Sequence, residues 1–351
     1  MANSTVNSSN IVTKYSAEVT AEFIRNNRFS RYTGTSPNNI IRIREGKQII
    51  SFPLISRLKS DGTTGSATLR GNGEALPNYA WSVTPTYRRN AVEFTKEDLD
   101  QPAFDMMAEA KPRLSAWARE VARDDVIAAM GAIYNGTTYS SYADATEAAK
   151  DTWLTNNSDR VLFGAATSNN AANDHSAALA QIDGTADDLS PDMVSLAKRL
   201  AKLADPHITP LRVEGADDEE VFIMFAGSYA FRDLKSNLGT AYQNAGPRSK
   251  DNPLFRDGDL YWDGVIIREI PEMSTITGVG AGSIDVAPCY LCGAEAISFG
   301  LGQRPTLKMD MDYDFAFQPG VAVEMKHQIR KTFFNNIQHG MVTVYASGVA
   351  D

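Results

Sequence analysis

Two cysteines are the residues of this sequence with the most specific chemistry. Cys289 and Cys292 form a lone Cys-x-x-Cys pair, a spacing found in redox pairs and in half of a zinc site. A zinc site would need two further ligands, and the sequence contains no second such pair. A redox pair is expected where a helix follows a strand, whereas residues 286–291 have strand character. The pattern therefore favours two cysteines that pack in the core.

The other chemical motifs are weaker. Asp310, Asp312 and Asp314 alternate as at the start of a calcium loop, but Phe315 and Val321 stand where that loop requires Gly and Glu. We interpret the alternation as the polar face of a strand.

The histidines lack the spacing of metal ligands, and they lie at positions 175, 207, 327 and 339. His327 occupies an apolar position of a strand pattern, which indicates a satisfied, partly buried side chain. The sequence has no Walker-type phosphate loop, no His-Glu-x-x-His and no Gly-x-Ser-x-Gly. We therefore expect no catalytic residues, no metal and no cofactor.

A basic ribbon is the more informative feature. Residues 46–94 contain two strand patterns around a polar, glycine-rich loop, and Pro53 and Pro85 each lie in one of the strands. Proline is tolerated in edge strands, and a two-stranded ribbon has only edges. We interpret the segment as a long β-hairpin that projects from the body. Its basic residues are either solvated or dock on an acidic neighbouring subunit, and they are Arg57, Lys59, Arg70, Arg88 and Arg89.

Composition narrows the possible functions. The chain has 351 residues, with 34 Lys and Arg against 43 Asp and Glu, a net charge of −9. An acidic chain is a poor nucleic-acid reader, because phosphate neutralisation needs clustered basic residues. No stretch approaches the roughly 18 to 20 apolar residues of a membrane span, and residues 1–10 lack a signal-peptide pattern. We expect a soluble protein made in a reducing cytoplasm.

One strong helical pattern spans residues 95–135. Residues 95–98 fit a capping box, Pro112 should kink the helix or start a second one, and Asn135-Gly136 should end it. Apolar residues then recur at helical spacing and predict a core-facing stripe. They are Phe104, Met107, Leu114, Trp117 and Val121, roughly continued by Ile127 and Tyr134.

Strand patterns return near the end of the sequence. Apolar residues alternate over 307–315 and again over 321–329, and residues 341–345 form a third strand pattern. If the first two strands pair with both apolar sets on one face, that face can cover the helix.

The middle of the chain alternates helices and strands. Ser190-Pro191 is a helix start, Val221–Phe225 is a buried strand, Ser228 caps a further helix, and residues 260–270 form a hairpin turning at Asp263-Gly264. Residues 137–188 are rich in Ala, Asn, Ser and Thr, with Trp153, Leu162 and Phe163 as the strong anchors.

The order of these segments resembles the major capsid protein fold shared by tailed bacteriophages. The motifs nearest to a family pattern are Glu220–Phe225, Tyr229–Lys235, Asn252–Phe255, Trp262–Glu269, Leu291–Ala296 and Gly300–Gly302, with Phe104 to Trp117 similar to the family's long helix. They are similar to the podovirus-type coat family whose namesake is the phage N-four coat protein.

The resemblance implies an α+β fold with a specific domain plan. Its parts are an N-terminal arm (1–45), an extended β-hairpin loop (46–94), a peripheral domain with a long spine helix (95–136 and 303–351), an irregular insertion (137–188) and an axial domain (189–302).

The expected function is that of a major coat protein that self-assembles into the icosahedral head shell enclosing phage DNA. The expected partners are further copies in pentamers and hexamers, with scaffold, portal and decoration proteins as additional candidates, DNA enclosed without sequence-specific contacts, and no membrane. The expected location is the virion, after assembly in the host cytoplasm.

Two alternatives stay open at this stage. One is a cytoplasmic enzyme with a Cys-x-x-Cys redox or metal site. The other is a polymer-binding module such as a tail or adhesion protein, against which the long helix counts because those are usually strand-dominated.

Overall fold

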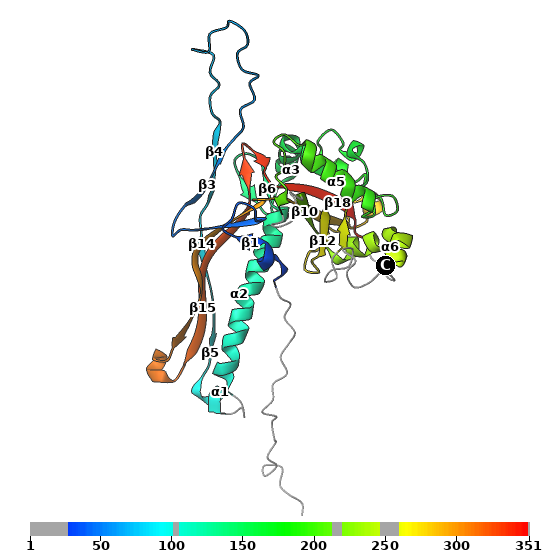
Figure 1. Ribbon diagram of the computed structural model, residues 1–351. Coiled ribbons are helices and arrows are strands. Elements are labelled where there is room, and N and C mark those ends of the chain that lie inside the picture. Colours follow the sequence, from blue (N-terminus) through cyan, green and yellow to red (C-terminus); the bar gives the residue numbers. More distant parts are fainter. Residues whose placement is uncertain (1–26, 101–104, 213–219, 246–259, 350–351) are drawn as a thin grey trace, which may run out of the picture. The chain divides into compact units, whose positions relative to one another are not determined.

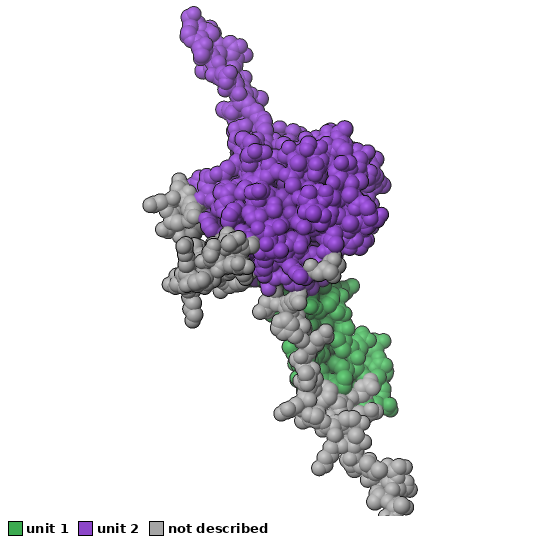
Figure 2. All heavy atoms as spheres, turned by 90° about the vertical axis from the view of Figure 1, so that its right-hand side faces the viewer, with its two compact units in different colours: residues 1–27, 86–122, 303–326 green, residues 28–85, 123–302, 327–351 purple. Residues whose placement is uncertain are grey.

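The computed structural model describes residues 27–100, 105–212, 220–245 and 260–349. They form two compact units built from interleaved segments (Figures 1 and 2). Unit 1 comprises Met1–Asn27, Thr86–Ala122 and Gln303–Lys326, and unit 2 comprises Arg28–Pro85, Arg123–Gly302 and His327–Asp351. Both units mix helices with strands, which agrees with the predicted α+β class.

Three elements contribute residues to both units: α2 (Met106–Gly131), β14 (Ile297–Asp310) and β15 (Gly320–Lys331). Unit 1 adds β5 (Thr86–Glu93) and α1 (Lys96–Asp100).

Unit 2 contains the remaining elements. Its helices are α3 (Glu147–Asn156), α4 (His175–Leu179), α5 (Pro191–Leu203) and α6 (Ser228–Ala245). Its strands are β1 (Thr33–Gly34), β2 (Ile41–Glu45), β3 (Ile50–Ile55), β4 (Asn78–Val83), β6 (Ile133–Tyr134), β7 (Tyr139–Ser140), β8 (Val161–Phe163), β9 (Leu211–Arg212), β10 (Glu220–Ala226), β11 (Leu260–Trp262), β12 (Val265–Glu269), β13 (Val286–Cys292), β16 (Phe333–Phe334), β17 (Ile337–Gln338) and β18 (Met341–Ser347).

A seven-stranded mixed sheet forms the centre of unit 2. Its order is β11-β12-β10-β13-β18-β8, with β9 paired to β10. Figure 1 labels β10, β12 and β18 of this sheet. One face packs on α5 and α6, through residues such as Val194 and Phe231. The other face packs on the end of α2, through residues such as Met130. Because both faces are covered, the central strands are apolar at nearly every position, as buried strands are.

The predicted helix starts and turns of this region are confirmed. The Ser190 side chain accepts a hydrogen bond from the Met193 N–H and caps α5. Strands β11 and β12 form the predicted hairpin, in which Asp263 and Gly264 both have positive φ, at 46° and 71°. Two adjacent positive φ values define the type I′ turn, which matches the twist of the flanking strands. Helix α6 begins at Ser228, one residue earlier than predicted, and extends to Ala245, well beyond the predicted range.

Unit 1 is a smaller sandwich of helix and strands. Val321, Val323 and Met325 of β15 are buried against Leu114 and Ala118 of α2. The predicted pairing of the spine helix with the late strands is confirmed for these residues. Trp117 packs against the same cluster but is only partly buried, so its predicted place in the core is correct only in part.

The spine helix begins and ends at other residues than those predicted. It continues through Pro112, six residues after its start at Met106, so the helix accommodates the one hydrogen bond that the missing N–H of Pro112 removes. It ends at Gly131, and Asn135-Gly136 instead lies in the connection between β6 and β7. Tyr134 is therefore a strand residue, and Phe104 lies outside the described residues.

The late strands also differ from the prediction. β14 and β15 are neighbours, but β14 ends at Asp310 and residues Tyr313–Ala316 form a 3-10 turn. The apolar set of β14 does not share the burial of the β15 set. Leu307 and Met309 remain exposed, because the buried cluster between α2 and β15 includes no residue of β14.

Three of the predicted segments contribute residues to the packing of unit 2. Residues Phe29, Ile40 and Ile41, assigned to the arm, are core residues of unit 2, whereas residues 1–26 lie outside the described ranges. The predicted insertion supplies β8, which pairs in parallel with β18. β18 itself, assigned to the peripheral domain, belongs to the seven-stranded sheet.

Candidate functional site

The two cysteines lie on opposite faces of one strand. β13 places Cys289 in the core that contacts α5 and α6, and Cys292 in the core on the other face of the sheet. Both thiols are free and fully buried. Burial raises the pKa of Cys289 to about 12 and also raises that of Cys292. Thiols directed to opposite faces cannot pair or share a metal, so the redox and zinc alternatives are wrong.

The buried histidines and lysine are structural groups of unit 2. His327 forms a 2.9 Å contact between Nε2 and Asp125 Oδ2, which confirms the predicted satisfied histidine. Burial lowers the pKa of His175 and of His339 to about 4. Burial likewise lowers the pKa of Lys331 to about 7, and its Nζ reaches Gln338 Oε1 at 3.4 Å.

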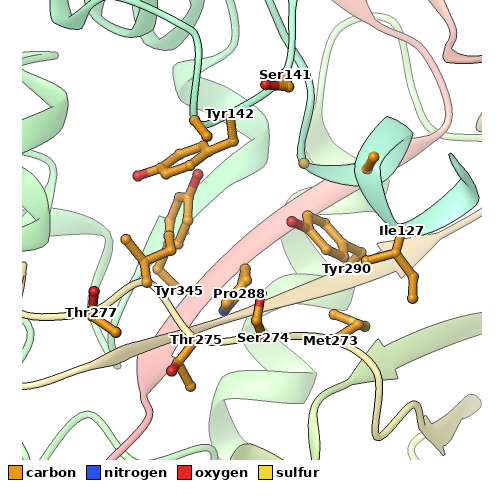
Figure 3. Close-up of a pocket in the computed structure, with 14 residues that line it drawn as sticks. Ile127, Ser141, Tyr142, Met273, Ser274, Thr275, Thr277, Pro288, Tyr290 and Tyr345 are labelled. Atoms are coloured by element: carbon orange, nitrogen blue, oxygen red, sulfur yellow. The ribbon is translucent and has the colours of Figure 1, made fainter. Parts of the chain in front are cut away.

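A cavity of about 460 Å³ lies in unit 2, lined by Tyr142, Tyr290 and Tyr345 together with small and apolar side chains (Figure 3). Burial raises the pKa of all three tyrosines above the ordinary value. The residues that line the cavity include no carboxylate, histidine or lysine. The hydroxyl groups in the lining therefore have no carboxylate, imidazole or amine beside them in the lining to activate them as nucleophiles.

The hairpin of β3 and β4 is the most distinctive surface feature of unit 2. It is antiparallel, from the pair Ile50–Val83 at its root to Ile55–Asn78 at its outer end. The root is fixed by burial of Phe52 and Trp81. The Trp81 ring lies 5.3 Å from that of Tyr134 and 5.7 Å from that of Phe333, an aromatic cluster that holds the base of the ribbon rigidly in the core.

The outer part of the hairpin is a loop over residues 56–77, which extends away from the body of unit 2 (Figure 2). We call this loop the hairpin tip. Glu74 organises it by accepting hydrogen bonds from the backbone N–H groups of Lys59 at 2.7 Å and Ser60 at 2.9 Å. These bonds lower the pKa of Glu74, which keeps the carboxylate ionised as an acceptor. Three leucines of the tip are nevertheless exposed: Leu58 (57%), Leu69 (67%) and Leu76 (59%).

The predicted basic contact residues are divided between the two units. Arg57 and Lys59 both bind the carboxylate of Asp205, at 3.1 and 2.7 Å, and Arg70 is exposed in the tip. Arg88 and Arg89 lie on β5 in unit 1, so their predicted place on the hairpin is wrong. The strand pattern misled because β4 and β5 are separated only by Thr84 and Pro85 and read as one strand.

Sequence reasoning missed the exposed apolar residues. The signal was present in the leucines within a loop that was otherwise polar and rich in glycine. A second set was hidden by its strand-like alternation and was predicted to be core. It comprises Leu307, Met309, Met311, Tyr313 and Phe315, all exposed in unit 1.

No helix in the described part of the chain is long and apolar enough to cross a membrane.

Comparisons with known proteins identify the family of this chain. A family model described as phage capsid protein matches residues 3–350. A curated major capsid protein of Pseudomonas phage KPP25 is 25% identical over 322 residues, which cover 81% of this chain and 79% of that protein.

Solved structures give the same result for the fold. The capsid of Cyanophage Pam1 matches with a TM-score of 0.90 and 30% identity over 100% of both chains. The capsid of Ralstonia phage GP4 matches with a TM-score of 0.74 and 20% identity, covering 97% of this chain and 96% of that one. The fold is thus that of tailed-phage major capsid proteins, and the chain belongs to the phage capsid protein family.

Proposed function

We propose that this chain forms the phage head shell and that the hairpin tip binds neighbouring copies in that shell. Family membership supports the first part, because the family model, the curated relative and the solved structures are all those of phage capsid proteins. The observation that carries the second part is the exposure of Leu58, Leu69 and Leu76 on a ribbon whose root is rigidly buried.

The hairpin tip is marginally stable in an isolated chain and would be stabilised by contact with another chain in an assembly. A two-stranded ribbon is marginally stable in water, and its edges carry unpaired backbone groups that can bind another chain. Exposed leucines gain about 25 cal/mol for each Å² of apolar surface that a partner removes from water. The tip therefore becomes ordered and dry when it lies on a second copy.

Charge supports the same contact. Arg57, Lys59 and Arg70 are positive groups on a chain with a net charge of −9. The pairs of Arg57 and Lys59 with Asp205 are more than half exposed, and such pairs are weak enough to exchange for a carboxylate of a neighbour. Arg88 and Arg89, exposed on β5, are proposed as contacts of unit 1.

The wider assembly follows from the same family plan. The copies would be arranged in pentamers and hexamers, with scaffold, portal and decoration proteins as further partners, and would enclose DNA without sequence-specific binding. The shell would assemble in the host cytoplasm and would require no catalysis. The finer division into arm, extended loop, peripheral domain, insertion and axial domain belongs to this proposal, as does the N-four type.

The test replaces residues 56–77 with Asn-Gly, which suits a two-residue turn joining Ile55 to Asn78, the last pair of the hairpin. A second variant replaces Leu58, Leu69 and Leu76 with Ser. Both should fold like the wild type by circular dichroism and fail to form closed shells by sedimentation and electron microscopy.

The matched control is Leu203→Ser, since Leu203 is equally exposed (69%) but lies at the end of α5. It should assemble normally. Closed shells from the Asn-Gly variant would overturn the role of the tip, while leaving the family membership intact.

A further inference from the structure

Three carboxylates and one imidazole converge where α3 packs beside the start of α4. Glu147 and Asp151 lie on α3, and Asp174 immediately precedes α4. One carboxylate oxygen from each of the three lies within 4.8 Å of the others. Three like charges at this separation repel one another unless a cation lies between them.

His175 supplies an independent indication of a ligand. Its side chain is fully buried, and its Nδ1 has no hydrogen-bond partner. Nδ1 lies 3.5 Å from Glu147 Oε1 and is therefore directed at the acidic cluster, while Nε2 faces the Tyr345 hydroxyl at 3.5 Å. A buried nitrogen without a partner is costly, and a neutral imidazole is the commonest metal ligand in proteins.

The carboxylates of the cluster already accept hydrogen bonds, but they keep lone pairs that could bind a cation. Asp151 Oδ1 accepts from the His175 N–H at 2.8 Å, and Asp174 Oδ1 accepts from the Ala177 N–H at 2.9 Å as the cap of α4. Each carboxylate has a second oxygen and further lone pairs. Lys150 approaches Glu147 Oε2 only at 3.6 Å, so it neutralises one of the three charges incompletely.

We propose that Glu147, Asp151, Asp174 and His175 bind one divalent transition-metal cation such as Mn²⁺. The donor set of carboxylate oxygens with one imidazole nitrogen favours such an ion over Ca²⁺ or Mg²⁺, which prefer oxygen alone. The ion would connect α3 to α4, two helices of unit 2 between which the chain forms β8. It would thereby fix this part of each copy without taking part in the proposed contact of the hairpin tip.

The experiment titrates Mn²⁺ into the purified chain and follows free Mn²⁺ by electron paramagnetic resonance. The wild type should bind one Mn²⁺ per chain, and Ca²⁺ should bind less tightly. Electron spin echo measurements should show coupling to one imidazole nitrogen, and bound Mn²⁺ should raise the melting temperature.

Two variants remove charge but preserve the fold. Asp174→Asn keeps a side chain that caps helices, and Glu147→Gln changes a side chain that is 44% exposed. Each should weaken Mn²⁺ binding by about tenfold or more. The matched control is Asp183→Asn, because Asp183 also accepts two backbone N–H bonds, from Thr185 and Ala186, but lies outside the cluster.

Three results would overturn the proposal. They are no stoichiometric binding up to about 1 mM Mn²⁺, the range of the weakest known protein sites, equal binding by the two variants and the control, and tighter binding of Ca²⁺ than of Mn²⁺. Absence of nitrogen coupling would exclude His175 as a ligand and would equally contradict the assigned donor set.

Discussion

Strand β18 of unit 2 and strand β5 of unit 1 show two opposite uses of a β-strand. Every residue of β18 is buried, because β13 and β8 flank it and helices cover the sheet. β5 is exposed at seven of its eight positions, although it belongs to the sheet of β14 and β15. The comparison teaches that the seven-stranded sheet of unit 2 is enclosed by elements of its own chain, whereas β5 of unit 1 is left exposed.

The largest effect should come from the closed core of unit 2. Phe222 of β10 is 1% exposed and packs with the residues of α5 and α6. Phe222→Ala should lower the free energy of unfolding by about 3 to 5 kcal/mol, through lost burial and the cavity left behind. Chemical denaturation or recovery of soluble protein measures this. A loss below about 1 kcal/mol would show that the core can rearrange.

The pH dependence of stability should reveal the lysine within that core. Lys331 has a pKa of about 7 when folded and about 10.4 when unfolded. Between these values the unfolded chain holds a proton that the folded chain lacks, so stability should rise with pH by up to about 1.4 kcal/mol per unit. Below the folded value this slope disappears.

The measurement compares the wild type with Lys331→Met from pH 7 to about 8.5. Cysteines of an unfolded chain begin to ionise in this range, but both proteins contain the same two cysteines, so the difference between the two profiles reports Lys331. The variant should lack the slope and be the more stable protein at pH 7. Parallel pH profiles for the two proteins would mean that Lys331 keeps its ordinary proton affinity.

A smaller loss is expected in unit 1. Trp117 is partly buried against the cluster of β15 and α2. Trp117→Ala should cost about 1 to 2 kcal/mol, because only part of its area leaves water on folding. Denaturation beside Phe222→Ala measures the difference. Equal losses for the two variants would remove the distinction between the closed and the open region.

The smallest effect on stability should come from the apolar residues of unit 1. Met309 and Phe315 are 58% and fully exposed, so replacing both with Ser should change stability by no more than about 0.5 kcal/mol. If unit 1 presents this surface to neighbours, sedimentation should show weaker self-association. A marked loss of stability would show that these side chains are already covered in the single chain.

Local patterns in the sequence predicted local structure well. The cap at Ser190, the turn at Asp263-Gly264 and the buried strand around Phe222 follow from side-chain chemistry that acts over a few residues. The hairpin was predicted because its glycines and prolines exclude a core. The place of β8 beside β18 could not be predicted, since the two strands are separated by some 180 residues of sequence and only tertiary packing joins them.

The exposure of apolar strand residues is the second feature that could not be predicted from the sequence. Alternation in Leu307–Phe315 looks the same whether the apolar side meets a helix of its own chain or another molecule. Arg57 and Lys59 were selected by charge as contacts with a neighbouring subunit, which stays a prediction. Their pairing with Asp205 was not predicted, because a pair between residues 146 to 148 positions apart leaves no trace in spacing.

The position of β18 in the sheet means that unit 2 cannot finish folding before the end of the chain is translated. Residues Met341–Ser347 lie between strands made much earlier, β8 from residue 161 and β13 from residue 286. A chain emerging from the ribosome therefore carries an open sheet, with apolar edges on both sides of a gap, until this strand is translated. Nascent chains are thus unable to present the finished body of unit 2, and addition to a growing particle must wait for translation to pass this point.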